Sequence, residues 1–182
     1  SLTQWYTPSW ISSILVNETI TRTEISRGKS WSFIDPACGA GHILIPAFHK
    51  LVTLQEAGSV EERVREILKH QLFGIDIDPL SVSLSCFALY LSIRDMGFKE
   101  DFPVPSIYSL KDRNSNCQFG SYILGLEKEA QTELAGYCLV APDGREYGLD
   151  KLPEKFDAIA ANPPYLSNRL LPEEYRRFLK KH

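Results

Sequence analysis

Residues 162–165 read Asn-Pro-Pro-Tyr and directly follow the apolar run 158–161 (AIAA). Proline cannot donate to a sheet ladder, and the residue before a proline avoids the helical region, so the pattern predicts a short buried strand that stops at Asn162. The side-chain oxygen of Asn162 and the carbonyl oxygen of Pro163 are both hydrogen-bond acceptors. Two converging acceptors can hold one planar amino group, and Tyr165 can stack on a flat ring beside it. The simpler alternative is a proline-rich turn with a half-buried tyrosine.

A second group of chemically suggestive residues is the glycine-rich segment 35–41 (DPACGAG), which lies between a predicted strand and a predicted helix. Gly39 and Gly41 lack side chains, so a ligand can approach the backbone closely. The helix that follows presents free amide groups and a positive dipole end. The spacing is neither the dinucleotide GxGxxG, because residue 44 is Leu, nor a P-loop, because no Gly-Lys-Ser/Thr follows. A tight strand-to-helix turn without a ligand is the alternative.

A third candidate is Asp76, which ends a second predicted strand in the segment 73–78 (FGIDID). An acid at this position can accept hydrogen bonds from both hydroxyls of a ribose, as nucleotide-binding folds do. Ile77 beside it can pack on an adenine ring. Asp78 precedes Pro79 and is better explained as the N-cap of the next helix. In open α/β sheets ligands bind at the carboxyl ends of the strands, where all these residues are expected.

The elements that must position these residues alternate between strand and helix. Apolar patterns predict a helix near residues 11–15, strands at 31–34, 71–78, 104–110 and 155–161, and helices at 43–54, 60–70 and 79–97. Residues 111–150 are rich in Asn, Gly, Ser and charge, and we expect an insertion or loop there with one short helix at 126–134. The alternation predicts an α/β fold with a mostly parallel sheet, right-handed crossovers and helices on both faces.

Bulk composition is that of one globular domain. The chain has 182 residues, of which 43% are hydrophobic and 24% charged, and no apolar run is long enough to cross a bilayer. The net charge of −3 is not that of a freestanding nucleic-acid binder, so in any function on DNA most phosphate contacts come from elsewhere. Basic residues gather near the end, and we favour a solvated helix face for Arg169, Arg176, Arg177, Lys180 and Lys181.

The cysteines and the chain ends add two expectations. Cys38, Cys86, Cys117 and Cys138 are widely spaced without a CxxC pair, which favours reduced thiols in a cytoplasmic protein and no metal site. The chain begins with Ser and stops within a predicted helix, so we expect residues 1–182 to be part of a longer protein.

In this order the segments resemble the catalytic core of adenine-specific, amino-group DNA methyltransferases of the γ type, as found in fused restriction–modification and phage-defence enzymes. The resemblance rests on WYTP (5–8), DPACGAGHIL (35–44), LFGIDIDPLSVSLSCFALYLS (72–92) and FDAIAANPPY (156–165). It covers most of the chain outside 111–150. It implies a Rossmann-like fold, S-adenosylmethionine as the cofactor, and double-stranded DNA with a flipped adenine as the substrate. A restriction or specificity subunit is a candidate partner.

The resemblance also implies roles for single residues. The methionine end of the cofactor would be lined by Tyr6, Thr7 and Pro8, and its cradle formed by Asp35, Ala37, Cys38, Gly39 and Gly41, with Asp35 near the cofactor amino group. Asp76 would hold the ribose and Ile77 the adenine face. The catalytic set would be Asn162, Pro163, Pro164 and Tyr165. In that set Asn162 and Pro163 bind the target amino group, and Tyr165 stacks on the flipped base.

Two departures from the family pattern affect these expectations. Where the family has Asp-Ser-Leu or Asn-Ser-Leu to contact the cofactor adenine, this chain has Tyr108-Ser109-Leu110. Stacking by Tyr108, or a contact from residues 111–150, could substitute. The family sheet continues for three more strands and is followed by a target-recognition region, and neither lies within 1–182. We therefore expect this catalytic-core fragment to bind cofactor weakly and to methylate nothing by itself.

Three other functions stay open at the level of sequence. Protein-glutamine methyltransferases also use Asn-Pro-Pro-Tyr, because a glutamine amide presents the same planar amino group, but WYTP and the long segment 111–150 argue against them. Adenine in RNA is a second acceptor. A non-catalytic cofactor-binding module is the third, and the intact Asn-Pro-Pro-Tyr argues against it.

Overall fold

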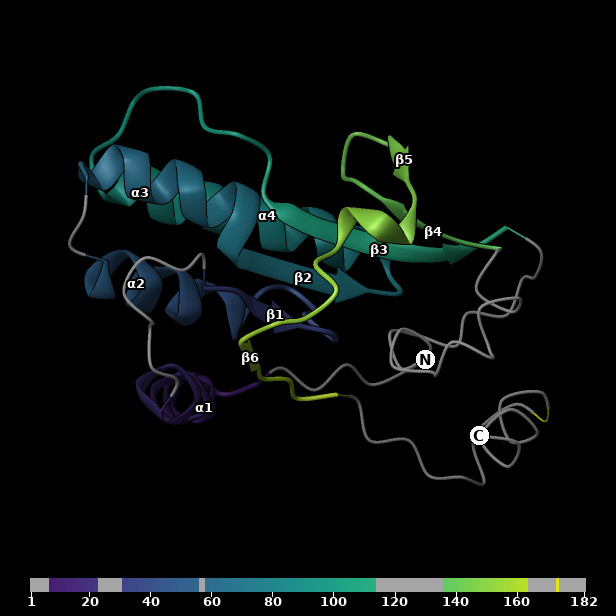
Figure 1. Cartoon of the computed structure of the whole chain (residues 1–182), viewed down its shortest axis with the longest axis horizontal. Helices are drawn as coiled ribbons and strands as arrows, with labels where there is room; N and C mark the ends of the chain where they lie inside the picture. The colour runs from purple at the N-terminus through teal and green to yellow at the C-terminus, as the bar shows by residue number, and fades with distance from the viewer. Residues whose placement is uncertain (1–6, 23–30, 56–57, 114–135, 164–172, 174–182) are drawn as a thin grey trace.

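The computed structural model describes residues 7–22, 31–55, 58–113, 136–163 and 173, in which helices and strands alternate over the first part of the chain (Figure 1). The helices are α1 (Ser9–Arg22), α2 (Leu44–Leu54), α3 (Val60–Glu66) and α4 (Pro79–Asp95), with a π-helical turn η1 (Ile67–Gln71) and a 3₁₀ turn η4 (Leu149–Lys151). The strands are β1 (Phe33–Asp35), β2 (Leu72–Asp76), β3 (Ser106–Asp112), β4 (Tyr137–Val140), β5 (Glu146–Tyr147) and β6 (Ala158–Ile159). No helix among the described residues is long and apolar enough to cross a membrane.

The strands form one six-stranded sheet in the order β5-β4-β3-β2-β1-β6. Strands β3, β2, β1 and β6 run parallel, whereas β4 is antiparallel to β3 and β5 is antiparallel to β4. The register pairs Asp35 with Gly74 and Phe33 with Ala158. The carboxyl ends of β1, β2 and β6 therefore lie at the same edge of the sheet.

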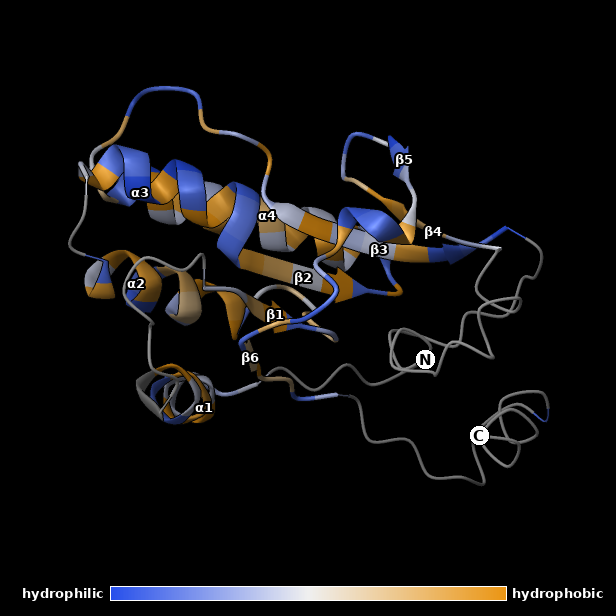
Figure 2. Ribbon diagram, viewed as in Figure 1, coloured by the Kyte–Doolittle hydropathy of each residue, from blue (hydrophilic) through white to orange (hydrophobic). Residues whose placement is uncertain are grey.

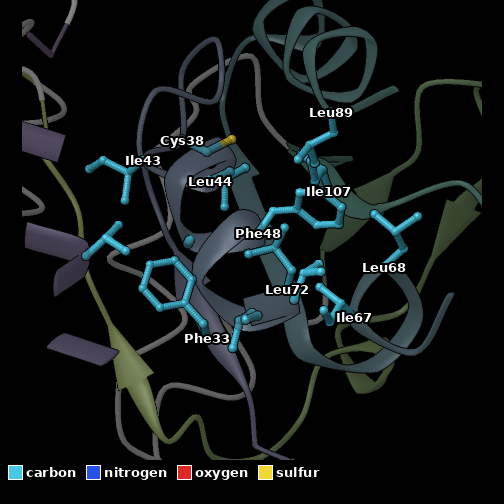
Figure 3. Close-up of a cluster of buried hydrophobic side chains, with 14 of the residues drawn as sticks. Phe33, Cys38, Ile43, Leu44, Phe48, Ile67, Leu68, Leu72, Leu89 and Ile107 are labelled. Atoms are coloured by element: carbon cyan, nitrogen blue, oxygen red, sulfur yellow. The ribbon is translucent and has the colours of Figure 1, made fainter. Parts of the chain in front are cut away.

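Side chains alternate between the two faces of the sheet and create two cores. On one face Phe33, Leu72 and Ile107 pack with apolar residues of all four α-helices. Figure 3 shows part of this cluster, with labelled side chains from the three strands, α2, η1 and α4, and Figure 2 colours the same elements by hydropathy. On the other face Ile34 and Tyr108 belong to a second cluster, which η4 and its neighbours cover. The predicted α/β class with a mostly parallel sheet is confirmed. The expectation of helices on both faces is not met among the described residues, where the four α-helices share one face and only the 3₁₀ turn lies on the other.

The expected loop at 111–150 is in part regular sheet. Strand β3 continues to Asp112, and β4 and β5 form an antiparallel hairpin beside it. Ala141 and Arg145 close the hairpin turn through a backbone hydrogen bond of 2.9 Å, and Gly144 adopts the positive φ (82°) that such turns require. The Pro-Asp-Gly of this turn was the available sequence signal. The predicted helix at 126–134 lies outside the described residues.

Strand β6 is shorter than the predicted buried strand, since among the described strands it lies at the sheet edge and pairs with the three-residue strand β1 alone. Its Ile159 is exposed rather than buried. Its start is anchored by Asp157, whose Oδ2 accepts hydrogen bonds from the backbone N–H and the hydroxyl of Ser32 at 2.9 and 3.2 Å. Two further bonds, from Ala158 N to Ser32 O and from Ala160 N to Ile34 O, hold the strand in register. These contacts fix where the chain leaves the sheet just before Asn162.

Gly74 allows β2 and α2 to approach closely, and this yields a first prediction. A Cβ at position 74 would lie 2.8 Å from Leu44 Cδ1 and 3.3 Å from Cys38 Sγ. We expect Gly74→Ala to lower the free energy of unfolding by about 1–3 kcal/mol, measured by urea denaturation, because the core is overpacked. In a Leu44→Val background, which removes the contacting methyl group, part of this loss should disappear. An equal loss of stability in both backgrounds would show that contact with Leu44 is not the cause.

Candidate functional site

The candidate site is built where three neighbouring parallel strands end. Asp35 ends β1, Asp76 ends β2, and Asn162 follows β6, with β1 lying between the other two strands (Figure 1). Sequence positions far apart are thus brought to one edge of the sheet. The carboxyl edge of a parallel sheet is the place where open α/β folds bind ligands.

Asp35 is a buried acid, with only 1% of its surface exposed. Its Oδ1 accepts a hydrogen bond from the backbone N–H of Ala37 at 3.0 Å, which fixes the start of the glycine-rich turn. Burial raises the pKa of Asp35 from 3.8 to about 7, the Ala37 hydrogen bond opposes this rise, and the nearby charge of Asp76 adds to it. A positively charged ligand group beside Asp35 would stabilise the ionised carboxylate.

Asp76 ties the glycine-rich turn to the end of β2. Its Oδ2 accepts a hydrogen bond from Gly39 N at 2.8 Å, and its Oδ1 accepts one from Asp78 N at 2.9 Å. Each carboxylate oxygen can accept a further hydrogen bond, and the side chain is partly exposed. Ile77, next to it, is 42% exposed, which leaves an apolar surface beside the acid.

The two glycines of the turn, both with positive φ, have different surroundings. At Gly39 (φ 51°) a Cβ would meet no atom of the described residues within 4 Å, so none of them fills the space beside this residue. At Gly41 (φ 87°) a Cβ would lie 3.2 Å from Ser85 Oγ and 3.3 Å from Ser85 Cα. Gly39 therefore leaves room for a ligand, whereas Gly41 allows the turn to pack against α4.

Ser85 is a site residue that the sequence interpretation missed. Its side chain is fully buried, and its Oγ donates a hydrogen bond of 2.6 Å to the carbonyl oxygen of Gly39. The local signal was weak, because Ser85 is one of four serines in this helix, with Ser81, Ser83 and Ser92. Asp78 acts as the predicted N-cap of α4, because its carboxylate accepts hydrogen bonds from Leu80 N and Ser81 N at 3.1 Å each.

Of the turn residues Ala37 and Cys38, only Cys38 is buried. The Cys38 thiol lies in the core beside Leu44 (Figure 3), and its burial raises the pKa of the thiol well above the ordinary value. The backbone N–H of Cys38 bonds to Ile75 O at 3.0 Å. Cys38 therefore anchors the turn to the core and to β2. Ala37, which lies between Asp35 and Cys38 in the sequence, is partly exposed.

Tyr108 is not available to stack on a ligand, and the suggestion that it substitutes for the usual acid or Asn is wrong. Its ring is buried on the sheet face opposite the α-helices, in edge-to-face contact with Tyr147 at a centroid distance of 5.9 Å. Alternation along β3 forces this placement, since Ile107 points to the helices. Ser109, which pairs with Asp76 in the register, donates instead to Val140 O at 3.4 Å.

Asn162 is joined to the start of the chain. Its Nδ2 donates a hydrogen bond of 3.1 Å to the hydroxyl oxygen of Thr7, which is buried at the start of α1. Among the described residues no donor contacts Asn162 Oδ1. Pro163 follows and is exposed, and Pro8 accepts two backbone hydrogen bonds of the first turn of α1. The expected site residues Tyr6, Pro164 and Tyr165 lie outside the described residues.

A buried acid, a glycine turn, a bridging carboxylate and an amide oxygen without a donor among the described residues lie at adjacent strand ends of an α/β fold, where such folds bind ligands. The sequence pattern of the family described as Eco57I restriction-modification methylase matches residues 70–182, more than half of the chain. The chain therefore belongs to this family.

Two curated relatives are described as adenine-specific methyltransferases. The adenine-specific methyltransferase PglX of Streptomyces coelicolor is 27% identical over 174 residues, which cover 88% of this chain and 14% of PglX. The adenine-specific methyltransferase BrxX of Escherichia coli O9:H4 is 38% identical over 68 residues, which cover 36% of this chain and 6% of BrxX. This chain thus spans only a small part of the relatives it matches.

One solved structure with similarity is described as a modification subunit of a type I restriction enzyme from Vibrio vulnificus YJ016. It is 25% identical, with a TM-score of 0.38, over 49% of this chain and 16% of that subunit.

The pKa of Asp35 gives a prediction that needs no ligand. Because the pKa rises from 3.8 to about 7 on folding, the native state keeps a proton that the unfolded chain releases between these values. The free energy of unfolding should therefore fall as the pH rises through this window. Relative to Asp35→Asn, which keeps an acceptor for Ala37 but cannot ionise, we expect the wild type to lose about 2–3 kcal/mol between about pH 5 and pH 8. Urea denaturation at both pH values measures this difference, and parallel losses in the two proteins would disprove the role of Asp35.

Proposed function

We propose that residues 1–182 form the S-adenosylmethionine-binding catalytic core of an enzyme that methylates the exocyclic amino group of adenine in DNA. The observation that carries the proposal is one juxtaposition. The cradle of Asp35, Gly39 and Asp76 and the acceptor pair of Asn162 and Pro163 lie at the ends of neighbouring strands. Family membership and the adenine-specific relatives support the same reaction class.

The residues present fit S-adenosylmethionine, whose bound form supplies an activated methyl group. No described side chain fills the space beside Gly39, so a ligand can lie against the backbone there. Asp76 retains acceptor capacity for ribose hydroxyls, and the exposed Ile77 offers an apolar surface for adenine. Asp35 is placed to hold the positively charged amino group of the methionine part, which would offset the cost of its ionisation.

The acceptor side of the proposal rests on hydrogen-bond chemistry. A planar amino group donates two hydrogen bonds, and Asn162 Oδ1 and the Pro163 carbonyl oxygen can accept them. These bonds orient the nitrogen and increase its electron density, so positioning and electrostatics carry most of the catalysis. Adenine must leave the duplex to present its amino group, and Tyr165 would stack on the flipped base. The adenine-specific relatives support this acceptor over a glutamine amide.

The proposed function also includes the binding partners of the protein and its location in the cell. A net charge of −3 supports a substrate contact in which double-stranded DNA is held mainly by a recognition region outside residues 1–182. The family supports a restriction–modification or phage-defence context, with a restriction or specificity subunit as a partner. The free thiols of Cys38, Cys86 and Cys138 support a cytoplasmic location.

Gly39→Ala tests the cofactor cradle. The substitution should cost about 1 kcal/mol of stability because φ is positive, while its methyl group enters the open space where the cofactor would lie. We expect affinity for S-adenosylmethionine, measured by calorimetric titration of the complete gene product, to fall at least about tenfold. Gly144→Ala is the matched control, since it has the same backbone requirement and open surroundings in a distant hairpin. Equal affinity for both variants would rule out the cradle.

Asn162→Ala tests the acceptor site. Removal of the amide should lower methyl transfer to DNA at least about 100-fold, since a preorganised hydrogen bond to the reacting group is lost. Cofactor affinity should stay within about twofold, because Asn162 is assigned to the acceptor and not to the cradle. Radiolabelled methyl transfer and calorimetry on the same preparation measure the two quantities. A comparable loss of both would remove Asn162 from the assigned role.

A further inference from the structure

The hydrogen bond between Asn162 and Thr7 joins residues 155 positions apart. Thr7 is 9% exposed, and it lies just before α1, where the resemblance implied a contact with the cofactor. We propose that Thr7 is instead a positioning residue for the acceptor site, which holds the amide of Asn162 with its oxygen toward the target amino group. This inference rests on the proposed function and adds a residue that acts through Asn162.

The two ends of an Asn amide have nearly the same shape but opposite hydrogen-bonding character. The oxygen accepts hydrogen bonds, and the nitrogen only donates them. A target amino group donates, so a rotated amide would place donor against donor and lose one of the two acceptors. The orientation of the Asn162 amide therefore decides whether the acceptor pair with Pro163 exists.

The Thr7 hydroxyl can accept from Nδ2 or donate to Oδ1, so it anchors one end of the amide in either orientation. Only the orientation with Nδ2 on Thr7 also turns Oδ1 toward a donating substrate, and in this orientation Thr7 gives Nδ2 its partner. At 3.1 Å its hydroxyl oxygen accepts the amide N–H, and Asn162 Oδ1 then stays available for the substrate. Without this hydroxyl, the productive orientation would leave a half-buried amide nitrogen unpaired. Such a loss typically corresponds to a several-fold to tenfold change in an equilibrium.

The position of Thr7 makes the hydroxyl a fixed partner. Its side chain is buried next to the first turn of α1, where the carbonyl oxygen of Pro8 accepts hydrogen bonds from Ile11 N and Ser12 N at 3.0 and 3.1 Å. The helix α1 packs in turn against α2 and β6. The hydroxyl is thus held by an element that contacts the strand leading to Asn162.

The kinetic test compares Thr7→Val with Thr7→Ser in the complete gene product. Methyl transfer is measured with radiolabelled S-adenosylmethionine on DNA from a host that lacks the gene. We expect Thr7→Val to lower kcat about five- to tenfold with cofactor affinity unchanged, and Thr7→Ser to restore most of the rate. Thr53→Val, which removes an exposed hydroxyl bonded to His49 O within α2, is the control and should behave as the wild type.

Three results would overturn the proposal. Unchanged kcat in Thr7→Val would show that the hydroxyl is not needed. Equal impairment of Thr7→Ser and Thr7→Val would assign the effect to packing. A loss of cofactor affinity that matches the loss of kcat would return Thr7 to the cofactor site.

A cycle of unfolding measurements tests the contact independently of activity. We expect Thr7→Val to lower the unfolding midpoint in the wild-type background and to have no further effect when Asn162→Ala is present, because the bond is already lost. Additive shifts would overturn the proposal. A wild-type protein that transfers no methyl group to DNA would reject the proposed function, and the unfolding cycle would still decide whether Thr7 positions Asn162.

Discussion

Both oxygens of the Asp76 carboxylate accept backbone hydrogen bonds, one from Gly39 and one from Asp78. Bonds of this kind are short and strong because the acceptor carries a charge. Through them one side chain fixes the turn after β1, the end of β2 and the entry into α4. In addition, the Ser85 hydroxyl of α4 donates a hydrogen bond to the carbonyl oxygen of Gly39, which ties α4 to the turn. The turn thus has a defined shape before any ligand arrives, which reduces the ordering cost of binding.

At Asp35, burial and charge oppose each other at this edge of the sheet. A buried carboxylate without a cation among its described contacts favours its neutral form, as the rise of its pKa to about 7 indicates. The proximity of Asp76 strengthens this tendency. In the proposed function, a cationic group of the cofactor would offset this cost, so Asp35 would weaken the free protein and strengthen the complex. Local conflicts of this type are typical of functional sites.

Features of the fold that depend on neighbouring residues could be predicted from the sequence. The features that the sequence analysis missed depend on contacts between residues far apart in the chain. The turn at Gly39 and the N-cap at Asp78 each follow from neighbouring residues, and both appear in the structure, whereas β6 ends at Ile159, before the stop expected at Asn162. The β4–β5 hairpin was missed because its strands are short and their pairing with β3 is non-local. The roles of Ser85 and Thr7 depend on partners distant in sequence, and no spacing rule identifies such partners.

The order of the strands in the sheet has a consequence for synthesis of the protein. Strand β6 pairs with β1, so the last described strand lies next to the first, and the contact between Thr7 and Asn162 spans almost the whole domain. A chain emerges from the ribosome with its N-terminus first, so Asp35, Gly39 and Asp76 emerge long before Asn162. Contacts of such long sequence separation form late in folding. A partly synthesised domain therefore lacks the contact between Thr7 and Asn162, which can form only after the last described strand has been made.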